Sequence, residues 1–588
     1  MQQFLAKLDS SLASHQLELA VSATEHQINI IRTMGSSFKV TLARALHVQG
    51  INLKNLGQWG EAVKITQEWV KLSQELFVAN PEKYRVELAD SLYKLGLYRS
   101  DLKEWKTAVE VTSQAVELYQ VLYAAEPETH RFELSRALYN LGYYHSNLHE
   151  WERAVEATSR AVELRRILFT ADPDTYRSDL SRALNNLGYY CSNLHEWEGA
   201  VEVMNQAVSL RQVLFNLDPD THRSNLSDTL NSLGYYHSQL NQWGRAVETT
   251  SQAVELYQVL FATDPERYRS SLSHSLYSLG YYQSMLEEWE GAVEATSQAA
   301  ELRQVLFNLD PDTHCSDLSD TLASLHIFRS HLKQWLGAVE AGGRVVELQQ
   351  VMYDADQEKY REILSDSLYR LATYRSKLEH WAGASQAMEQ AVVLREVLFA
   401  AAPDTYRMDL AEALHFLEFF QSQLGDQSGA AKTLRRIIEL REILATSDST
   451  AHRAALALPC NTLAWFLRDS GRPEQGLKYV LDAITIFRTA SSKDELDLVY
   501  YLSASLDTAA ACMHDVGRSR EALAYSEEAI ALLRSCVELA PSDSSYRTTL
   551  FDVAGVYSNI LKSLGETEKA EEITREMGEL RERGILAN

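Results

Sequence analysis

The residues best suited to chemistry in this chain are paired tyrosines that follow a glycine and recur at a fixed interval. The first tyrosines of the Gly-Tyr-Tyr phrase stand 46 residues apart, at Tyr143, Tyr189, Tyr235 and Tyr281. Small polar residues follow them at matching positions: Ser146, Ser192, Ser238, Ser284, Asn147 and Asn193. Aromatic rings beside short hydrogen-bonding groups suit noncovalent recognition of a peptide rather than the making or breaking of bonds.

The two tyrosines of each phrase have different expected roles. The second, such as Tyr144, continues an apolar stripe at helical spacing, so we predict that it packs in the core. The first, such as Tyr143, lies about 100° further around the helix and off that stripe. Stacked over four units, the first tyrosines either line a groove together with the serines and asparagines or only seal adjacent repeats. Both interpretations stay open at this point.

Signatures of catalysis and of metal binding are missing from the sequence. It has no HExxH, GxSxG or glycine-rich dinucleotide motif, and GRPEQGLK at Gly471–Lys478 lacks the Lys-Ser/Thr ending of a phosphate-binding loop. His145 and His237 share a repeat position, but one ligand per unit about 10 Å apart cannot close a coordination sphere. We therefore expect neither an enzyme nor a bound cofactor or metal.

A tryptophan that recurs every 46 residues indicates the helices that position these residues. A small residue stands three places after each tryptophan, as Ala154 follows Trp151, and the register continues without the tryptophan to about Thr567. A fixed period of this length indicates one supersecondary unit copied about twelve times. The tryptophans of the series are Trp59, Trp105, Trp151, Trp197, Trp243, Trp289, Trp335 and Trp381.

Each unit reads as two amphipathic helices of about 20 residues. Apolar residues recur at spacings of three and four over 134–148 and again over 151–168, with the short polar link His149-Glu150 between them. Asp-Pro phrases such as Asp172-Pro173 separate the units, because Asp caps a helix and Pro is preorganised for its first turn. The pattern predicts stacked antiparallel helix hairpins and an all-α fold.

Leu141-Gly142, the aromatic Trp151 nine residues later, and then Ala154 and Ala161 resemble the tetratricopeptide repeat signature. The resemblance implies a right-handed superhelical solenoid of about twelve antiparallel hairpins, with the first helix of each unit on the concave face. The period here is 46 residues rather than the usual 34. Such long units resemble kinesin-light-chain repeats and, more closely, the arrays of fungal proteins that carry NACHT or CHAT domains.

The array divides into three stretches by its regularity. Residues 1–35 read as an N-terminal cap or degenerate half-repeat, 36–445 as the regular array, and 446–588 as divergent repeats that end in a charged capping helix. A subdomain break is expected near 445–452, where serine-rich loops begin.

Bulk properties narrow the partners and the compartment. The formal net charge of −25 disfavours nucleic acid, since phosphate binding needs clustered Lys and Arg. Five scattered cysteines without a CxxC pair suit reduced thiols, and neither a signal peptide nor a membrane-spanning apolar run is visible. We expect a cytoplasmic protein that does not bind membranes.

These observations together favour a protein–protein interaction scaffold that binds a peptide or protein segment in a groove. An alternative is a ligand-sensing regulatory module of a multidomain STAND-type signalling protein whose effector domain is not encoded in this chain. A kinesin-light-chain-like adaptor is a further alternative, although the first 35 residues are short for a pairing segment. The identity of the protein ligand, the biological process and the oligomeric state are left open by the sequence.

Overall fold

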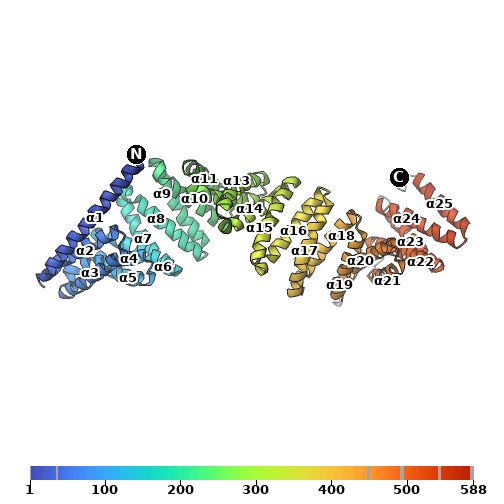
Figure 1. Cartoon of the computed structure of the whole chain (residues 1–588), viewed down its shortest axis with the longest axis horizontal. Helices are drawn as coiled ribbons and strands as arrows, with labels where there is room; N and C mark the ends of the chain where they lie inside the picture. Colours follow the sequence, from blue (N-terminus) through green and yellow to red (C-terminus); the bar gives the residue numbers. More distant parts are fainter. Residues whose placement is uncertain (1, 35–37, 446–449, 491–495, 541–543, 583–588) are drawn as a thin grey trace. The chain divides into compact units, whose positions relative to one another are not determined.

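The computed structural model describes the chain except for residues 1, 35–37, 446–449, 491–495, 541–543 and 583–588. All 25 regular elements of the described part are α-helices, as predicted (Figure 1). They form two compact units, Met1–Leu306 and Phe307–Asn588.

Helix α1 (Gln2–Thr33) is followed by hairpins, each made of a first helix, called the A helix, and a second, called the B helix. The A helices are α2 (Lys39–Asn55), α4 (Pro81–Asp101), α6 (Pro127–Asn147), α8 (Pro173–Asn193), α10 (Pro219–Gln239), α12 (Pro265–Ser284), α14 (Pro311–His331), α16 (Gln357–Lys377), α18 (Pro403–Gln423), α20 (Thr450–Asp469), α22 (Leu496–Asp515) and α24 (Ser544–Ser563). The B helices are α3 (Trp59–Ala79), α5 (Trp105–Ala125), α7 (Trp151–Ala171), α9 (Trp197–Leu217), α11 (Trp243–Thr263), α13 (Trp289–Leu309), α15 (Trp335–Ala355), α17 (Trp381–Ala401), α19 (Gln427–Ala445), α21 (Pro473–Ala490), α23 (Ser519–Leu539) and α25 (Thr567–Glu582).

The ends of the helices follow from the residues at the boundaries. Asp172 caps α8, where its Oδ1 accepts a hydrogen bond from the Thr175 amide at 3.2 Å, and Pro173 is the first helical residue. Between the A and B helices the chain reverses through one residue in the left-handed region, such as His195 at φ 58°. The tryptophan then begins the B helix. The predicted Asp-Pro boundaries and short polar links are confirmed.

The two helices of a hairpin approach closely because small residues face each other. Ala154 and Ala161 of α7 are fully buried, as the sequence predicted. The structure adds a third contact, because a Cβ on Gly142 of α6 would overlap Thr158 Oγ1 of α7. The glycine of the repeat therefore serves backbone approach between the paired helices.

Successive A helices lie closer together than successive B helices. The pairs α4 and α6, α6 and α8, and α10 and α12 contact one another, and no pair of successive B helices in the described chain does so to the same extent. This asymmetry places the A helices on the inner side of the stack within each unit. We call the solvent-facing side of the A helices the A-helix face.

The sequence predicts a division of the chain into residues 1–35, 36–445 and 446–588. α1 packs on α2, and its Ile28 and Ile31 are buried. The predicted break near 445–452 includes residues 446–449, which lie outside the described residues. The cap at 1–35 and the divergent stretch 446–588 therefore stay predictions about domain organisation.

Candidate functional site

The first tyrosine of each Gly-Tyr-Tyr phrase packs edge-on against the tryptophan of the preceding hairpin. The Tyr189 ring of α8 lies 6.0 Å from the Trp151 ring of α7, with an interplanar angle of 88°. Tyr235 and Trp197 repeat this geometry at 6.0 Å and 87°. Edge-to-face pairs of this kind are favourable beyond their buried area, so each ring is held in one orientation.

These rings nevertheless stay open to solvent. Tyr143, Tyr189, Tyr235 and Tyr281 are 44%, 51%, 47% and 43% exposed. The second tyrosine of the phrase is buried, with Tyr144 only 2% exposed, so the predicted core role of that residue is confirmed. The A-helix face of α6, α8, α10 and α12 therefore carries one fixed, half-exposed aromatic ring per repeat. Lining a groove and sealing adjacent repeats are compatible roles for these tyrosines, because each ring contacts a neighbouring repeat and also faces solvent.

The serines predicted beside these rings are buried and already bonded. Ser146 is 8% exposed, and its hydroxyl donates to the Tyr143 carbonyl at 2.8 Å. Serines hold the next hairpin as well, since the Tyr374 hydroxyl donates to Ser330 Oγ at 3.0 Å. Ser192, Ser238 and Ser284 are buried like Ser146. The structure thus places the serine column between repeats and not on the solvent-facing surface.

The two predicted asparagines remain partly exposed beside the tyrosines. The side-chain amide of Asn147 donates to the Tyr143 carbonyl at 2.8 Å, and Asn193 makes the same bond to Tyr189. Each amide is fixed by its nitrogen, which leaves its oxygen directed elsewhere as an acceptor. The tyrosine rings and the asparagine amides are therefore the predicted residues that can meet a ligand.

A series of hydrogen bonds between successive A helices was not predicted from the sequence. We call it the asparagine–tyrosine ladder. Asn140 Nδ2 donates to the Tyr93 hydroxyl at 2.9 Å, and Asn186 Nδ2 donates to the Tyr139 hydroxyl at 3.0 Å. The partners are 47 residues apart, one more than the period, and that offset is the signal that could have found them. These bonds link successive A helices.

Buried arginines support the same ladder from the B helices. The Arg165 guanidinium lies 4.3 Å from the Tyr139 ring centre, and its Nη1 donates to the Asp179 carbonyl at 2.6 Å. Burial lowers the pKa of Arg165 below the usual value for arginine. Arg211, Arg303 and Arg395 stand at equivalent positions in other hairpins and are also buried.

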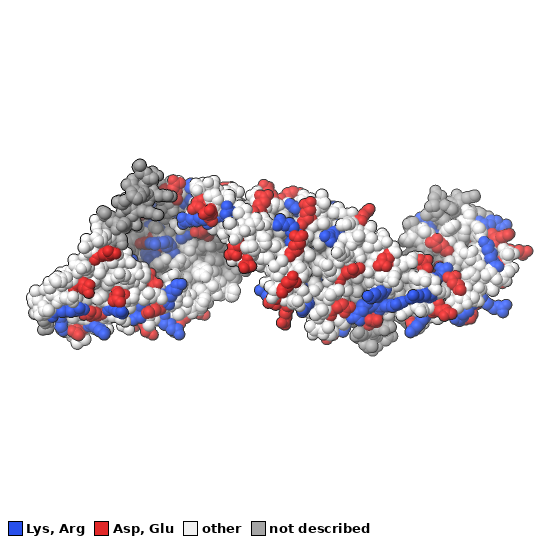
Figure 2. Space-filling view, viewed as in Figure 1, with Lys and Arg blue, Asp and Glu red and all other residues white. Residues whose placement is uncertain are grey.

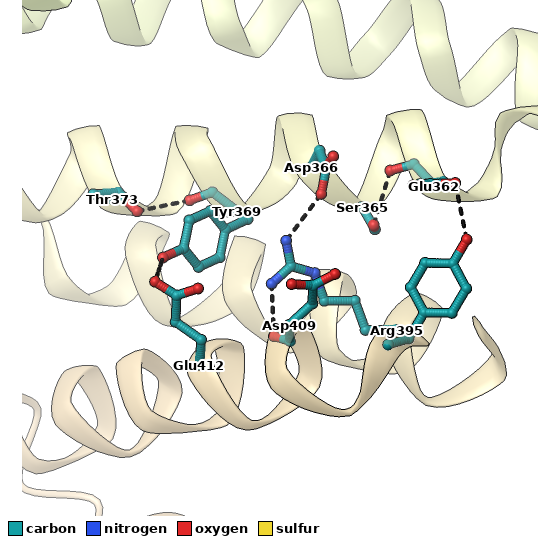
Figure 3. A network of polar contacts seen from close by, with 9 residues as sticks. Glu362, Ser365, Asp366, Tyr369, Thr373, Arg395, Asp409 and Glu412 are labelled. Atoms are coloured by element: carbon teal, nitrogen blue, oxygen red, sulfur yellow. Dashed lines mark hydrogen bonds and ion pairs between the residues drawn. The ribbon is translucent and has the colours of Figure 1, made fainter. Parts of the chain in front are cut away.

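In the second unit Arg395 is part of a wider polar network (Figure 3). Arg395 of α17 points toward α16 and α18, where it bonds Asp366 Oδ1 at 2.9 Å and the Asp409 carbonyl at 2.8 Å. The Tyr369 hydroxyl donates to Glu412 Oε1 at 2.9 Å in the same layer. The network connects three helices of consecutive hairpins, and we assign it a structural role.

Two of the described cysteines are poorly suited to act as nucleophiles. Burial raises the pKa of the Cys191 and Cys512 thiols to about 11, which suppresses the nucleophilic thiolate. No three His, Cys, Asp or Glu side chains within the described ranges lie close enough together to hold a metal ion. None of the described helices combines the length and apolar character needed to cross a bilayer. Figure 2 shows basic side chains scattered among acidic ones on the face in view.

Comparisons with known proteins bear on the fold alone. No family model and no curated protein matches the sequence. Among solved structures, BtubC from P. vanneervenii is 16% identical, with 42% of this chain and 92% of that chain covered at a TM-score of 0.32. A putative kinesin light chain of Podosopora anserina with nearly identical TPR-like repeats is 14% identical, with 37% and 95% covered at 0.29.

A third solved structure is a STAND protein with a tetratricopeptide repeat sensor from Pyrococcus horikoshii. It is 12% identical, with 66% of this chain and 54% of that chain covered at a TM-score of 0.39. The helix pairing, the glycine at the helix crossing and the alanines of the B helix are those of the predicted signature. The chain has an all-α helical-repeat fold, and its hairpins resemble tetratricopeptide repeats. Its units are long: in six of the twelve described hairpins both helices have 21 residues.

Proposed function

We propose that the chain is a protein-interaction scaffold that binds a peptide or protein segment along the A-helix face of α6, α8, α10 and α12. Tyr143, Tyr189, Tyr235 and Tyr281 are the main contacts in this proposal, with Asn147 and Asn193 as polar neighbours. The observation that carries it is the regular column of half-exposed rings, each held edge-on by a tryptophan. Serines 146, 192, 238 and 284 support the column from within the stack.

The physical argument concerns the entropy of binding. Tyrosine offers a large amphipathic contact area with few rotatable bonds, and tyrosine is enriched among residues that dominate binding energy. Rings already fixed by Trp151 and Trp197 lose little further freedom when a ligand covers them. One ring per repeat, about 10 Å apart along packed helices, suits an elongated segment that contacts several repeats in turn.

The experiment compares partner capture by the intact chain and by a chain with Tyr189→Ala and Tyr235→Ala. A matched control carries Val213→Ala and Val259→Ala, which shorten exposed apolar side chains on the B helices of the same hairpins. We expect a protein from an extract of the source cells to be retained by the intact chain and the valine control, and lost from the tyrosine variant. Circular dichroism is used to check that all three chains remain helical.

Equal capture by all three chains would contradict the proposal, because the binding site would then lie away from the tyrosines. Tyr189→Phe and Tyr235→Phe separate the roles of ring and hydroxyl, since phenylalanine retains the edge-on contact. Phe419 already occupies this position in the second unit, 46% exposed and 5.8 Å from the Trp381 ring. We therefore expect the phenylalanine variant to fold normally and to keep most of its binding.

A further inference from the structure

Two cavities lie on either side of the B helix α17. The smaller cavity, of about 430 Å³, is bounded by α15, α16 and α17. The larger cavity, of about 580 Å³, is bounded by α17, α18 and α19. Glu389 and Val393 of α17 line both cavities, so one helix separates two neighbouring spaces. Volumes of this size accommodate small molecules or the side chains of a partner protein.

Both cavities can be reached from solvent. At the base of the smaller one are Leu364 and Leu368 of α16, which are buried, and at the base of the larger one are Leu414 and Leu417 of α18. The other residues of the smaller cavity are mostly exposed and form its rim. These rim residues are Gln350 of α15 and Gln386, Glu389, Gln390 and Val393 of α17.

The helix α17 departs from the earlier B helices at the two residues that the cavities share. In the six preceding B helices an uncharged residue occupies the position of Glu389, and a glutamate occupies that of Val393 in five of the six. In α17 the acid thus stands one helical turn earlier, at both cavities, and an exposed valine takes its place. The equivalent residues are Ser113, Ser159, Asn205, Ser251, Ser297 and Gly343 at the first position, and Glu117, Glu163, Ser209, Glu255, Glu301 and Glu347 at the second.

Glu389 gives the smaller cavity a negative charge. Of the described residues that line this cavity, Glu389 alone is charged. Its Oε1 accepts only long hydrogen bonds, of 3.4 Å each, from Ser385 and from Gln421. The side-chain amides of Gln386 and Gln390 have no hydrogen-bond partner among the described residues. The smaller cavity therefore offers a carboxylate and two amide oxygens, which are acceptors suited to a cation.

Charged groups in the larger cavity largely offset one another. Arg436 Nε and Nη2 donate to the two carboxylate oxygens of Glu396, at 2.8 Å each. Asp426 and Lys432 carry opposite charges at the exposed rim. With its charges offset in this way, the larger cavity suits an apolar side chain that covers the leucines of α18.

We propose that a segment of a partner protein docks across α17, with a basic side chain in the smaller cavity and a large apolar side chain in the larger one. A lysine ammonium donates to Glu389 and to the amide oxygens of Gln386 and Gln390, while its aliphatic stem packs on the leucines of α16. The site lies in the second unit and is separate from the tyrosine column.

The width of α17 sets the spacing of the two side chains. A helix with its side chains is about 10 Å wide, and an extended chain advances about 3.3 Å per residue. The basic and the apolar residue therefore stand about three positions apart. Val393 and Val397, one helical turn later, are 65% and 46% exposed and give apolar surface to the residues between them.

The test titrates the full chain with two blocked tetrapeptides, N-acetyl-Lys-Ala-Ala-Phe amide and N-acetyl-Phe-Ala-Ala-Lys amide, which differ in chain direction. Binding is measured by saturation-transfer NMR. We expect at least one of them to bind the intact chain. Replacing its lysine by norleucine, which lacks the ammonium, or its phenylalanine by alanine should weaken binding at least threefold.

The protein variants carry residues that other repeats have at the same positions, so we expect them to fold. Glu389→Ser and Val393→Ser should each weaken binding of the lysine peptide at least threefold. Glu255→Ser removes an equally exposed acid from α11 and is the control. The norleucine peptide should bind Glu389→Ser as it binds the intact chain, because the ammonium and the carboxylate act as a pair. The chain with Tyr189→Ala and Tyr235→Ala should bind both peptides normally.

Absence of binding by both tetrapeptides would overturn the proposal. Equal binding of the lysine and norleucine peptides, or of the lysine peptide by the intact chain and Glu389→Ser, would overturn the assignment of the basic side chain to Glu389. Butylammonium that binds as tightly as the peptide would overturn docking across both cavities, because the smaller cavity would then act alone.

Discussion

His326 of α14 faces Gly342 of α15, so the larger residue is on the A helix. In the neighbouring hairpin the larger residue is on the B helix. One repeat earlier the A helix carries Gly280 and the B helix carries Thr296, and a Cβ on the glycine would overlap the threonine hydroxyl. Between α14 and α15 the large residue is on the A helix instead. A Cβ on Gly342 would come within 2.6 Å of the His326 ring. Each of these two crossings therefore holds one large and one small residue, supplied by opposite helices.

This complementarity predicts a rescue experiment. Gly342→Thr restores the residue of the preceding repeat but places it against His326, so we expect a loss of about 1–3 kcal/mol in the free energy of unfolding. Adding His326→Gly to that variant should return most of the loss. Gly343→Ala is the control, because a Cβ there meets nothing within 4 Å. Urea unfolding of the four chains checks this, and full stability of Gly342→Thr alone would refute the size exchange.

His326 also predicts a dependence of stability on pH. Its Nδ1 lies 2.7 Å from the Ala338 carbonyl, its other ring nitrogen is buried without a partner, and burial lowers its pKa to about 4. The folded histidine thus stays neutral where the unfolded one, near 6.5, becomes protonated, so stability is lost as pH falls from about 6.5 to 4. The full difference is roughly 3 kcal/mol.

The measurement compares unfolding midpoints of the intact chain with those of the His326→Gly, Gly342→Thr double variant across that pH range. The intact chain should lose more stability on acidification, because the variant lacks the buried imidazole. Parallel curves for the two chains would show that protonation of His326 does not oppose folding.

The left-handed turn residues predict opposite effects at two equivalent positions. Lys333 has a φ of 57°, and Gly425 has a φ of 74° at the same place two repeats later. A side chain at positive φ costs about 1 kcal/mol, so Lys333→Gly should stabilise and Gly425→Ala should destabilise the fold by about that amount. Thermal unfolding of both variants checks the signs, and a destabilised Lys333→Gly chain would contradict the argument.

The network around Arg395 predicts an asymmetry between its two charged members. The Arg395 side chain is 7% exposed and the Asp366 side chain is 53% exposed. Arg395→Ala leaves a cavity and removes the hydrogen bonds to Asp366 and to the Asp409 carbonyl, so we expect a loss of about 2–4 kcal/mol. Asp366→Asn should cost less than about 1 kcal/mol, because water replaces the lost contact. Similar losses for both variants in denaturant unfolding would contradict this assignment.

The repeat architecture could be predicted because the period repeats the same local rules many times. Trp151, the Asp172-Pro173 boundary and the alanines of the B helix fix helix starts and helix approach within one unit. Each of these signals acts between residues close in sequence or one helix apart. That is why the sequence predicted helices of nearly the observed length.

Contacts between successive units were harder to predict. Helical periodicity places Ser146 beside Tyr143 but does not show that the next hairpin covers it, so its burial was missed. The role of Arg165 could not be predicted, because a charged residue at a repeated position is usually solvent-exposed, whereas Arg165 contacts the Tyr139 ring and the Asp179 carbonyl of adjacent helices.

The most direct test of the proposed binding site replaces Tyr189, and separately Tyr235, with the photoreactive analogue p-benzoyl-phenylalanine. The same analogue at Val213, on the B-helix side of the same repeats, is the control. After irradiation in an extract of the source cells, we expect the analogue at positions 189 and 235 to cross-link to the same partner protein, at neighbouring peptides of that partner. The analogue at position 213 should not cross-link to it. Failure of both tyrosine positions to cross-link a protein, or identical products from all three positions, would contradict a binding site on the tyrosine column.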